Sequence, residues 1–237
     1  MAAPCGVPVT FHDPLSRKIK RPFSRTANPK PFSFPCVIIN IMDSLQEIKN
    51  HLISLARELR NLFPDLYLAG GTAIMIKYDH RISYDLDLFS NEIELSSLEA
   101  RMRDRYEREI ERIVHFPEGD NIDFFLGGTK VSFVRFPFPN VEPTETREGV
   151  RMASDRDLLL NKVYVAGRRV EAKDPVDIAC LLLHHPEWRL DTVRTDFRKK
   201  FKDEKFEIYL AAVLAFEDYP GLDEATRSIL ERWNGSD

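Results

Sequence analysis

The chain of 237 residues is long enough for one substantial core, and its 43% hydrophobic and 30% charged residues exclude a disordered polyelectrolyte. No apolar run approaches the roughly 20 residues that a membrane span needs, so we expect a soluble protein. A net charge of -4 excludes a surface that is basic throughout, so nucleic-acid contact requires a local basic patch. Cys5, Cys36 and Cys180 form no paired framework and no CxxC motif, which favours a cytoplasmic location.

Residues 1–41 differ in composition from the rest of the chain. They hold seven of the fifteen prolines and one acid, Asp13, among several lysines and arginines. Such a segment does not easily bury a core, so we expect a Pro-rich basic extension that is disordered or that precedes a true start at Met42. A transit peptide and a nucleic-acid-binding tail are the alternatives.

From Met42 onward, hydrophobic periodicity and turn signals predict the elements in chain order. A helix, a strand, a helix, a strand, a charged helix and the two strands of a Gly127-Gly128 hairpin are expected over 43–62, 66–69, 72–78, 84–89, 95–113, 121–126 and 129–136. A proline-rich linker follows, and then helices over 155–166, 175–184, 189–217 and 222–233. The predicted fold class is therefore α+β, with a mixed domain over 42–150 and a helical lobe over 151–237.

Two aspartates alternate along the strand expected over 84–89. Residues two apart on a strand point to the same face, so Asp85 and Asp87 lie side by side while Leu86 and Leu88 face the core. Adjacent carboxylates repel each other, and a cation relieves the repulsion; hard oxygen ligands of this kind suit Mg²⁺. The alternative is an edge strand with a solvated face.

A pair of glycines stands at the end of the preceding strand. Gly70 and Gly71 let the backbone approach an anion closely, and Thr72 is placed to cap the next helix, whose first amides attract phosphate. The alternative is a pair that only permits a tight bend. Together with the aspartates, the pair indicates a nucleoside triphosphate held by backbone amides on one side and by carboxylate-bound magnesium on the other.

The string GGTAIMIKYDHRISYDLDLFS, residues 70–90, resembles the signature of AbiEii-type nucleotidyltransferases, toxins of type IV toxin-antitoxin systems in the DNA polymerase β-like superfamily. Its turn, short helix, HR-x-S step and D-x-D-L-F strand match at Gly70, Gly71, His80, Arg81, Ser83, Asp85, Asp87 and Phe89. A second block is similar to the family's helical-lobe motif at Lys162, Arg169, Lys173, Asp174 and Asp177. With KVSFVRFPF at 130–138, the resemblance spans roughly residues 60–185.

The resemblance implies a polymerase β-like mixed sheet with flanking helices, followed by a helical lobe that completes the active site. It implies transfer of a nucleoside monophosphate from an NTP to an acceptor, with Mg²⁺ held by Asp85 and Asp87. Catalytic roles would fall to Asp85, Asp87, Lys162 and Asp177. Nucleotide contacts would come from Gly70, Gly71, Thr72, Arg81, Ser83, Arg169, Lys173 and Asp174.

Simpler structural roles remain open for several of these residues. Arg81 could form a surface ion pair with Asp79 or Asp85. Lys162, on a helix, could extend into solvent. Asp174 before Pro175 has the sequence of a helix N-cap, which would place Asp177 at a structural position three residues further on.

One position departs from the family's pattern. Polymerase β-like enzymes commonly take a third carboxylate from a neighbouring strand, and the matching position here is Ser132. In a two-residue hairpin, Leu126 opposes Thr129, so Asp123 lies directly across from Ser132 and shares its face. We therefore expect Asp123 to replace the missing metal ligand.

The acceptor is suggested by a basic segment, residues 194–206, which carries Arg194, Arg198, Lys199, Lys200, Lys202 and Lys205. Its phenylalanines, Phe197, Phe201 and Phe206, are expected to pack into the core. A cationic edge on an acidic protein can guide RNA, and the resemblance makes a tRNA or other RNA 3′ end the leading acceptor, with a protein hydroxyl as the alternative.

Two other classes of function stay open. A small-molecule nucleotidyltransferase of the antibiotic-modifying kind shares the glycine and aspartate pattern but would need an acidic pocket for a polycation. A non-catalytic module that binds an NTP, or an antitoxin partner, would follow from loss of the third carboxylate. Magnesium-dependent turnover separates the enzymes from the binding module.

Overall fold

The computed structural model describes residues 36–117 and 119–236, with side chains from Leu45 onward. The expectation for residues 1–41 therefore lies almost entirely outside the described residues. Helix α1 (Cys36–Leu62) begins before the position 43 that the apolar spacing predicted and ends where it predicted. Within residues 36–117 and 119–236, each helix is too short or too polar to span a membrane.

A seven-stranded mixed sheet forms one layer, with the strand order β3-β4-β5-β2-β1-β7-β6. The β2–β5 and β1–β7 pairs are parallel and the other pairs are antiparallel. The strands are β1 (Tyr67–Ala69), β2 (Leu86–Ser90), β3 (Ile110–His115), β4 (Asn121–Leu126), β5 (Thr129–Arg135), β6 (Glu145–Arg147) and β7 (Val150–Met152). The α+β fold class is confirmed.

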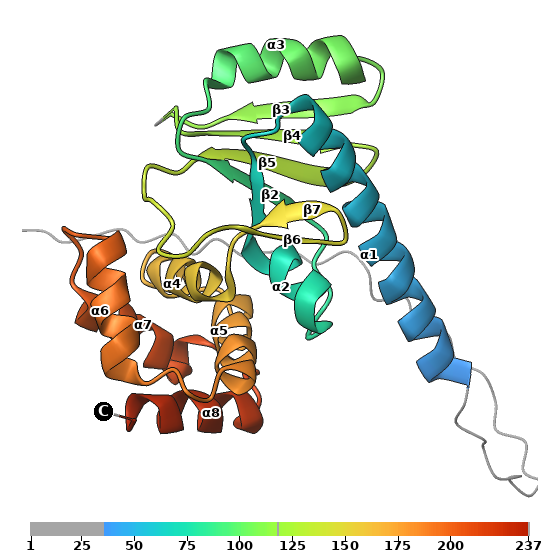
Figure 1. Ribbon diagram of the computed structural model, residues 1–237. Coiled ribbons are helices and arrows are strands. Elements are labelled where there is room, and N and C mark those ends of the chain that lie inside the picture. Colours follow the sequence, from blue (N-terminus) through green and yellow to red (C-terminus); the bar gives the residue numbers. More distant parts are fainter. Residues whose placement is uncertain (1–35, 118, 237) are drawn as a thin grey trace, which may run out of the picture.

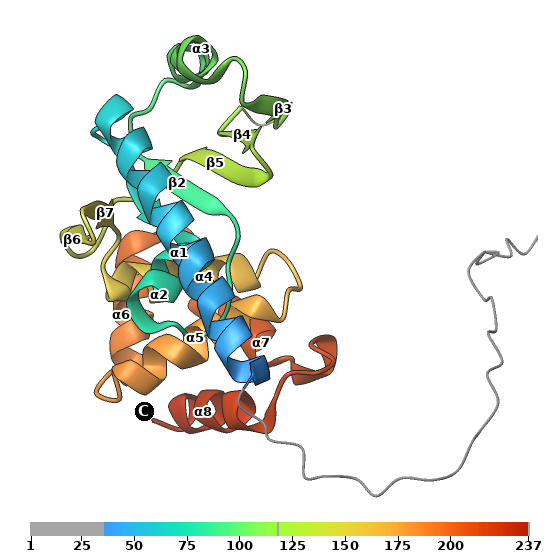
Figure 2. The same ribbon diagram turned by 90° about the vertical axis from the view of Figure 1, so that its right-hand side faces the viewer.

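Helices surround this sheet and then form a lobe of their own. They are α2 (Gly70–Tyr78), α3 (Leu95–Tyr106), α4 (Asp155–Ala166), α5 (Lys173–His184), α6 (Leu190–Lys200), α7 (Phe206–Leu214), the 3₁₀ turn η1 (Phe216–Asp218) and α8 (Glu224–Asn234). In Figures 1 and 2, α1 runs along the sheet as a long rod, α3 lies beside β3 and β4, and α4 to α8 gather at the other end. One apolar cluster joins both parts, from Leu52 in α1 to Trp233 in α8.

Helix α4 follows the sequence rules closely, and it carries several site residues. Ser154 caps its first turn by accepting a hydrogen bond from the Asp157 amide, and Gly167 follows its last residue. The expected bounds, 155–166, are those of the structure. Because the ends of α4 are set locally, the residues along it are positioned reliably against the sheet.

The helix expected over 95–113 is wrong in its second half. It ends at Tyr106, and Ile110–His115 forms β3, the edge strand beside β4. The charged residues there fit an exposed helix face and an exposed edge strand equally well. Backbone pairing with β4, together with the β-branched residues of IERIVH, stabilises the strand over the helix.

The expected helix over 189–217 is also interrupted. Helix α6 ends at Lys200, and α7 begins at Phe206. Both Phe201 and Phe206 are fully buried, as is Phe197, so the break brings aromatic rings from both helices into the core. The prediction that these three rings pack inside is confirmed.

A short hairpin, β6 and β7, follows the expected linker and was not predicted. Strand β7 pairs with β1 through Leu68 and Met152, so the sheet extends to Met152 and the expected domain boundary at 150 falls inside β7. The helical part begins with α4. The charged sequence ETREGVRM, residues 145–152, does not indicate a strand, because the strand β7 within it depends on pairing with β1, which is distant in the sequence.

Candidate active site

A cavity of 680 Å³ lies between one face of the sheet and helix α4. Alternate residues of three strands face it, as side chains on one face of a sheet must. These are Asp87 and Phe89 of β2, Asn121 and Asp123 of β4, and Lys130, Ser132 and Val134 of β5. Asp87, the second aspartate of the pattern found in the sequence, therefore faces a cavity large enough for a nucleotide.

Helix α4 supplies the opposite wall. Residues at helical spacing along one of its sides line the cavity: Leu158, Asn161, Lys162 and Val165, with Arg168 and Arg169 just beyond its end. The sheet side thus carries Asp87 and Asp123 together with Lys130, whereas the charged residues on the helix side are all basic. Such a division suits a ligand that carries phosphates and a bound cation at one end.

Gly70 joins β1 to α2 and packs directly against Asp87. Its φ of +68° lies in the left-handed region, and a Cβ atom there would lie 2.2 Å from Asp87 Oδ2. Helix α2 starts at this residue, and its N-cap, Ala69, contributes no side-chain hydrogen bond. The first amides of α2 therefore remain for an anion beside the Asp87 carboxylate.

We expect Gly70→Ala to lower both stability and nucleotidyl transfer. An alanine at this φ costs about 1–2 kcal/mol, and its methyl group also displaces Asp87. Gly128→Ala is the matched control, because Gly128 has a φ of +80° with nothing within 4 Å of its Cβ position. Urea unfolding should show similar losses for both variants, whereas only Gly70→Ala should lose activity. Equal activities would mean that the Gly70–Asp87 contact has no catalytic importance.

Asp85 and Asp87 lie close to each other at the start of β2, with Asp85 just before the strand. Burial raises the pKa of Asp87 above its ordinary value; the charge of Asp85 raises it further, and Lys130 and Lys162 oppose the shift. Lys130 Nζ lies 3.7 Å from Asp85 Oδ2 and 3.9 Å from Asp123 Oδ2. The Lys130 ammonium group thus lies between the Asp85 and Asp123 carboxylates, and its positive charge reduces the repulsion between them.

The predicted hairpin register is confirmed. Asp123 pairs with Ser132 and Ser132 pairs with Asp87, so the three side chains form one row across β4, β5 and β2. Asp123 is therefore two strands from Asp87, which is about 10 Å between backbones. Among the described residues, no group of three acidic, histidine or cysteine side chains is placed to hold a metal ion. Ser132 occupies the strand between them, and the role of Asp123 as the replacement metal ligand stays a prediction.

Lys162 is buried and paired. Its Nζ lies 2.8 Å from Asp174 Oδ1 and 2.6 Å from Asp177 Oδ2. The Arg169 guanidinium donates to both oxygens of Asp174, at 2.9 and 3.1 Å. Burial acts to raise the pKa of Asp174, but the hydrogen bonds from Arg169 and Lys162 hold it below its ordinary value. The capping role considered for Asp174 is wrong, because Ala172 is the N-cap of α5.

Asp177 is the most heavily paired carboxylate at the site. Arg81 donates to both of its oxygens, at 2.6 and 2.7 Å, and His80 Nε2 lies 2.6 Å away. Burial acts to raise its pKa, but these hydrogen bonds and the charge of Lys162 hold the pKa of Asp177 far below its usual range. Arg81 therefore pairs with Asp177 and not with Asp79 or Asp85. A carboxylate held ionised by Arg81, Lys162 and a hydrogen bond with His80 is a poor proton acceptor, which argues for a positioning role.

The remaining residues of the first motif pack behind the cavity. Thr72 is buried within α2 and does not cap it; its hydroxyl donates to the Asp85 carbonyl and lies 2.9 Å from Ser83 Oγ. A Cβ on Gly71 would lie 2.3 Å from Arg81 Nη2, so this glycine makes room for the arginine. Lys173 lies apart from the cavity and pairs with Glu171 at 2.7 Å.

Of the predicted site residues, the cavity brings together Gly70, Asp87, Asp123, Lys162 and Arg169. Asp85 does not line the cavity, but it lies 3.7 Å from Lys130, which does. Asp174 and Asp177 pair with Lys162, the other lysine of the cavity. Reasoning from the sequence missed Lys130 and Asn161. Strand alternation with Ser132 would have indicated the first, and helical spacing from Leu158 and Val165 the second.

Comparison with known proteins identifies the family. The family model described as "Nucleotidyl transferase AbiEii toxin, Type IV TA system" matches residues 53–232. The chain belongs to the AbiEii family. The match takes in the sheet, the cavity and the helical lobe, and it makes the protein a member of the nucleotidyltransferases.

Other similarities are more distant. The AbiEii-family chain is 31% identical over 161 residues to "Uncharacterized protein aq_aa25" of Aquifex aeolicus (strain VF5), covering 65% of this chain and 75% of that protein. Among solved structures, Megavirus polyadenylate synthase aligns at a TM-score of 0.43 and 13% identity, covering 71% of this chain but 41% of its own. An antigenic nucleotidyltransferase-like protein from Paracoccidioides brasiliensis aligns at 0.45 and 18%, covering 77% and 93%. At these TM-scores the structures carry no argument about function.

Proposed function

We propose that this AbiEii-family chain transfers a nucleoside monophosphate from a magnesium-bound NTP to an RNA 3′ end. The observation that carries the proposal is the placement of Asp87 against Gly70, at the start of α2, across the cavity from Lys162 and Arg169. The acceptor hydroxyl oxygen bonds to the α-phosphorus, and the bond from that phosphorus to the bridging oxygen breaks. Pyrophosphate leaves with the electron pair, and the hydroxyl proton passes to solvent.

The residues present fit a divalent cation. Asp87 is a carboxylate whose pKa burial raises, beside a second carboxylate, so an oxygen-preferring cation relieves a real electrostatic cost. Mg²⁺ commonly uses one or two protein carboxylates, with water and substrate phosphates as its other ligands, so Asp85 and Asp87 suffice. When bound, the ion supplies positive charge to the phosphates and to the leaving group.

The protein groups mainly position the donor. The first amides of α2 hold phosphate beside Gly70, and Lys162 and Arg169 face the same region from the helical lobe. Asp174 and Asp177 keep Lys162 in place, and Asp177 keeps Arg81 behind the glycines. In this proposal Asp123 pairs with Lys130, and Ser83 and Thr72 fix the backbone at Asp85.

The function is tested by incubating the purified protein with Mg²⁺, total RNA and each α-³²P-labelled NTP in turn. Labelled RNA that is absent with the Asp85→Ala, Asp87→Ala double variant is the expected result, and it identifies the donor. Labelled protein would indicate a hydroxyl side chain as the acceptor. Binding of NTP with no label on any acceptor would favour the non-catalytic module.

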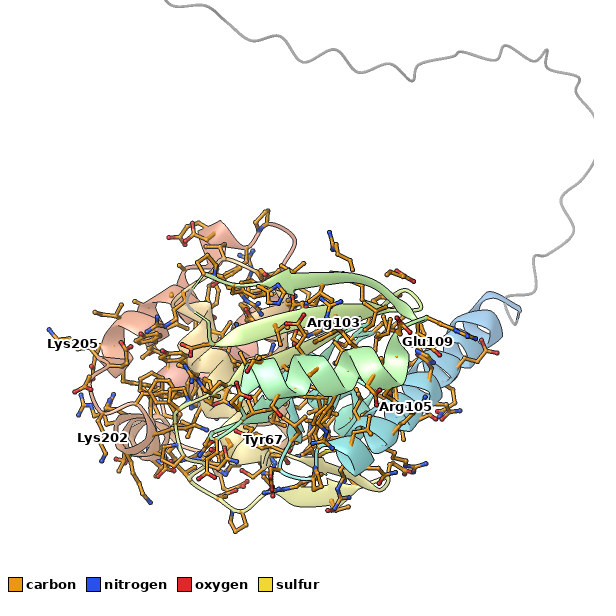
Figure 3. All side chains as sticks on the ribbon, turned by 90° about the horizontal axis from the view of Figure 1, so that it is seen from above. Tyr67, Arg103, Arg105, Glu109, Lys202 and Lys205 are labelled. Atoms are coloured by element: carbon orange, nitrogen blue, oxygen red, sulfur yellow. The ribbon has the colours of Figure 1, made fainter. Side chains whose placement is uncertain are left out.

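The RNA acceptor is supported by the lysines that remain exposed between α6 and α7. Lys200 is buried against Asp157 at 2.5 Å, and Arg198 pairs with Glu207 at 2.7 Å, so the basic edge is smaller than the sequence suggested. Figure 3 shows Lys202 and Lys205 at the outer edge of the helical lobe, directed away from the molecule. Glu204, on the same loop, pairs at 2.5 Å with the cavity residue Arg168.

We expect a Lys202→Glu, Lys205→Glu variant to bind RNA more weakly and with a smaller salt dependence. Each lost phosphate contact should reduce the slope of log K against log salt by roughly 0.7 for single strands. Arg103→Glu, Arg105→Glu makes the same charge change on α3, away from the lobe (Figure 3), and should leave binding unchanged. Equal losses in both variants, measured by filter binding, would show that only net charge matters.

The family description also bears on partners and location. A type IV toxin-antitoxin family makes a cognate antitoxin a reasonable partner, and we include one in the proposal. The cytoplasmic location expected from the cysteines stays a prediction. A small-molecule acceptor is the second candidate, and the acidic face formed by Asp87 and Asp123 is the observation that favours it.

A further inference from the structure

Asn161 is a buried polar side chain that the protein itself leaves unpaired. It lies on α4 with 7% of its surface exposed, and it lines the 680 Å³ cavity. Neither its amide nitrogen nor its amide oxygen has a hydrogen-bond partner among the described protein groups. Buried amides without partners are uncommon and cost free energy, so a position of this kind calls for a reason.

The neighbours of Asn161 indicate which part of a ligand it meets. Lys162, the next residue, lines the same cavity as Asp87 and as Gly70, where helix α2 begins, so the phosphate end of a nucleotide belongs there. Three phenylalanines, Phe89, Phe136 and Phe138, also line the cavity, with successive ring centroids 5.0 Å apart. Their planes are inclined to one another by 46° and 67°, and a single aromatic ring is enough for a nucleobase to stack on.

We propose that Asn161 hydrogen-bonds the edge of the donor nucleobase and thereby selects which NTP is used. The inference rests on the proposed nucleotidyl transfer and extends it to donor specificity. A side-chain amide presents a donor and an acceptor side by side, and the bases differ in whether an edge offers the complementary pair; the N6/N7 edge of adenine does, whereas the N7/O6 edge of guanine offers two acceptors. Phosphate oxygens only accept hydrogen bonds, so a phosphate contact would leave the amide oxygen of Asn161 unpaired.

The test compares the dissociation constants of the four NTPs, measured by calorimetry, for the wild type and Asn161→Leu. Leucine is close in size to asparagine but has no polar atoms. The preferred NTP should bind about 10- to 100-fold more weakly, with the other three changing less than about threefold. A uniform loss for all four NTPs overturns base selection, because a ribose contact would behave in that way. So does a wild type that binds all four equally.

A matched control and a stability measurement exclude a structural explanation. Asn91→Leu makes the same change at an exposed asparagine that does not line the cavity, and it should keep the ranking of the four NTPs. Asn161→Leu should melt no lower than the wild type, because it removes an amide without a protein partner. Asn161→Ala serves as a second variant, and a large fall in melting temperature for both would show that the residue is structural.

The transfer assay separates failure of this inference from failure of the function. A wild type that transfers no nucleotide in the ³²P assay removes the proposed function, and the inference with it. A wild type that transfers one NTP preferentially, with Asn161→Leu keeping that preference, removes the inference alone. The expected result is a variant that still transfers label but has lost the preference.

Discussion

Replacing Asp87 by asparagine should abolish nucleotidyl transfer while leaving the fold intact. The amide keeps the shape of the carboxylate against Gly70 but cannot hold Mg²⁺ with comparable strength. Loss of about 4 kcal/mol of charge stabilisation corresponds to about a 10³-fold fall in rate. Single-turnover transfer of label to RNA is the measurement.

The same substitution should not lower stability at neutral pH. Because burial raises the folded-state pKa of Asp87 above the ordinary 3.8, the folded chain binds the proton more tightly than the unfolded chain. Stability from this group therefore falls as the pH rises from about 3.8 through the folded-state pKa, and the cost is fully present above it. Asp87→Asn removes that cost, so its urea midpoint at pH 7 should equal or exceed that of the wild type.

Asp120→Asn provides the control for both measurements. Asp120 forms an exposed pair with Arg135 at 2.5 Å, with about half of each side chain in solvent, and such pairs contribute little to stability. Its rate and its urea midpoint should stay near those of the wild type. Transfer by Asp87→Asn within tenfold of the wild type would contradict the metal-ligand role.

Replacing Asp177 by asparagine should destabilise the fold by about 3–5 kcal/mol, because the change leaves Arg81 without its counter-ion and Lys162 with Asp174 alone. Arg81 and Lys162 both depend on this carboxylate, and it is fully buried. Arg81 belongs to the sheet domain and Asp177 to the helical lobe, so loss of their ion pair weakens the contact between the sheet domain and the lobe. Denaturant unfolding at pH 7 measures the effect, and activity should fall with it.

The pH dependence gives an independent check. The folded-state pKa of Asp177 lies below the unfolded value of 3.8, so its stabilisation is present above about pH 4 and is lost as the pH falls towards the folded-state pKa. The wild type should therefore lose stability on acidification more steeply than Asp177→Asn.

Asp223→Asn is the matched control for Asp177→Asn. Asp223 is an exposed helix cap whose hydrogen bonds to Thr226 lower its pKa, and asparagine caps a helix about as well as aspartate. It should change stability by less than about 0.5 kcal/mol. A loss at Asp177 no greater than that at Asp223 would show that the buried network contributes little to the contact between the sheet domain and the lobe.

Short-range sequence signals specify the local units of this protein. The Gly127-Gly128 turn set the hairpin register that places Asp123 across from Ser132, and Ser154 and Gly167 set the ends of α4. The Gly70 turn and the alternating aspartates indicate the family from residues 70–90 alone. Each of these signals acts within a few residues, where backbone geometry and local hydrogen bonds dominate.

Tertiary structure alone decided how those units meet. Arg81 and Asp177 lie 96 positions apart, and no local pattern shows that they form a bidentate pair. Likewise, IERIVH forms the strand β3 because it pairs with β4. The Asn161 amide has no partner among the described protein groups because it faces the cavity between the sheet and α4. Long-range pairing and burial depend on which surfaces come together, and that information is spread over the whole chain rather than held in any one segment.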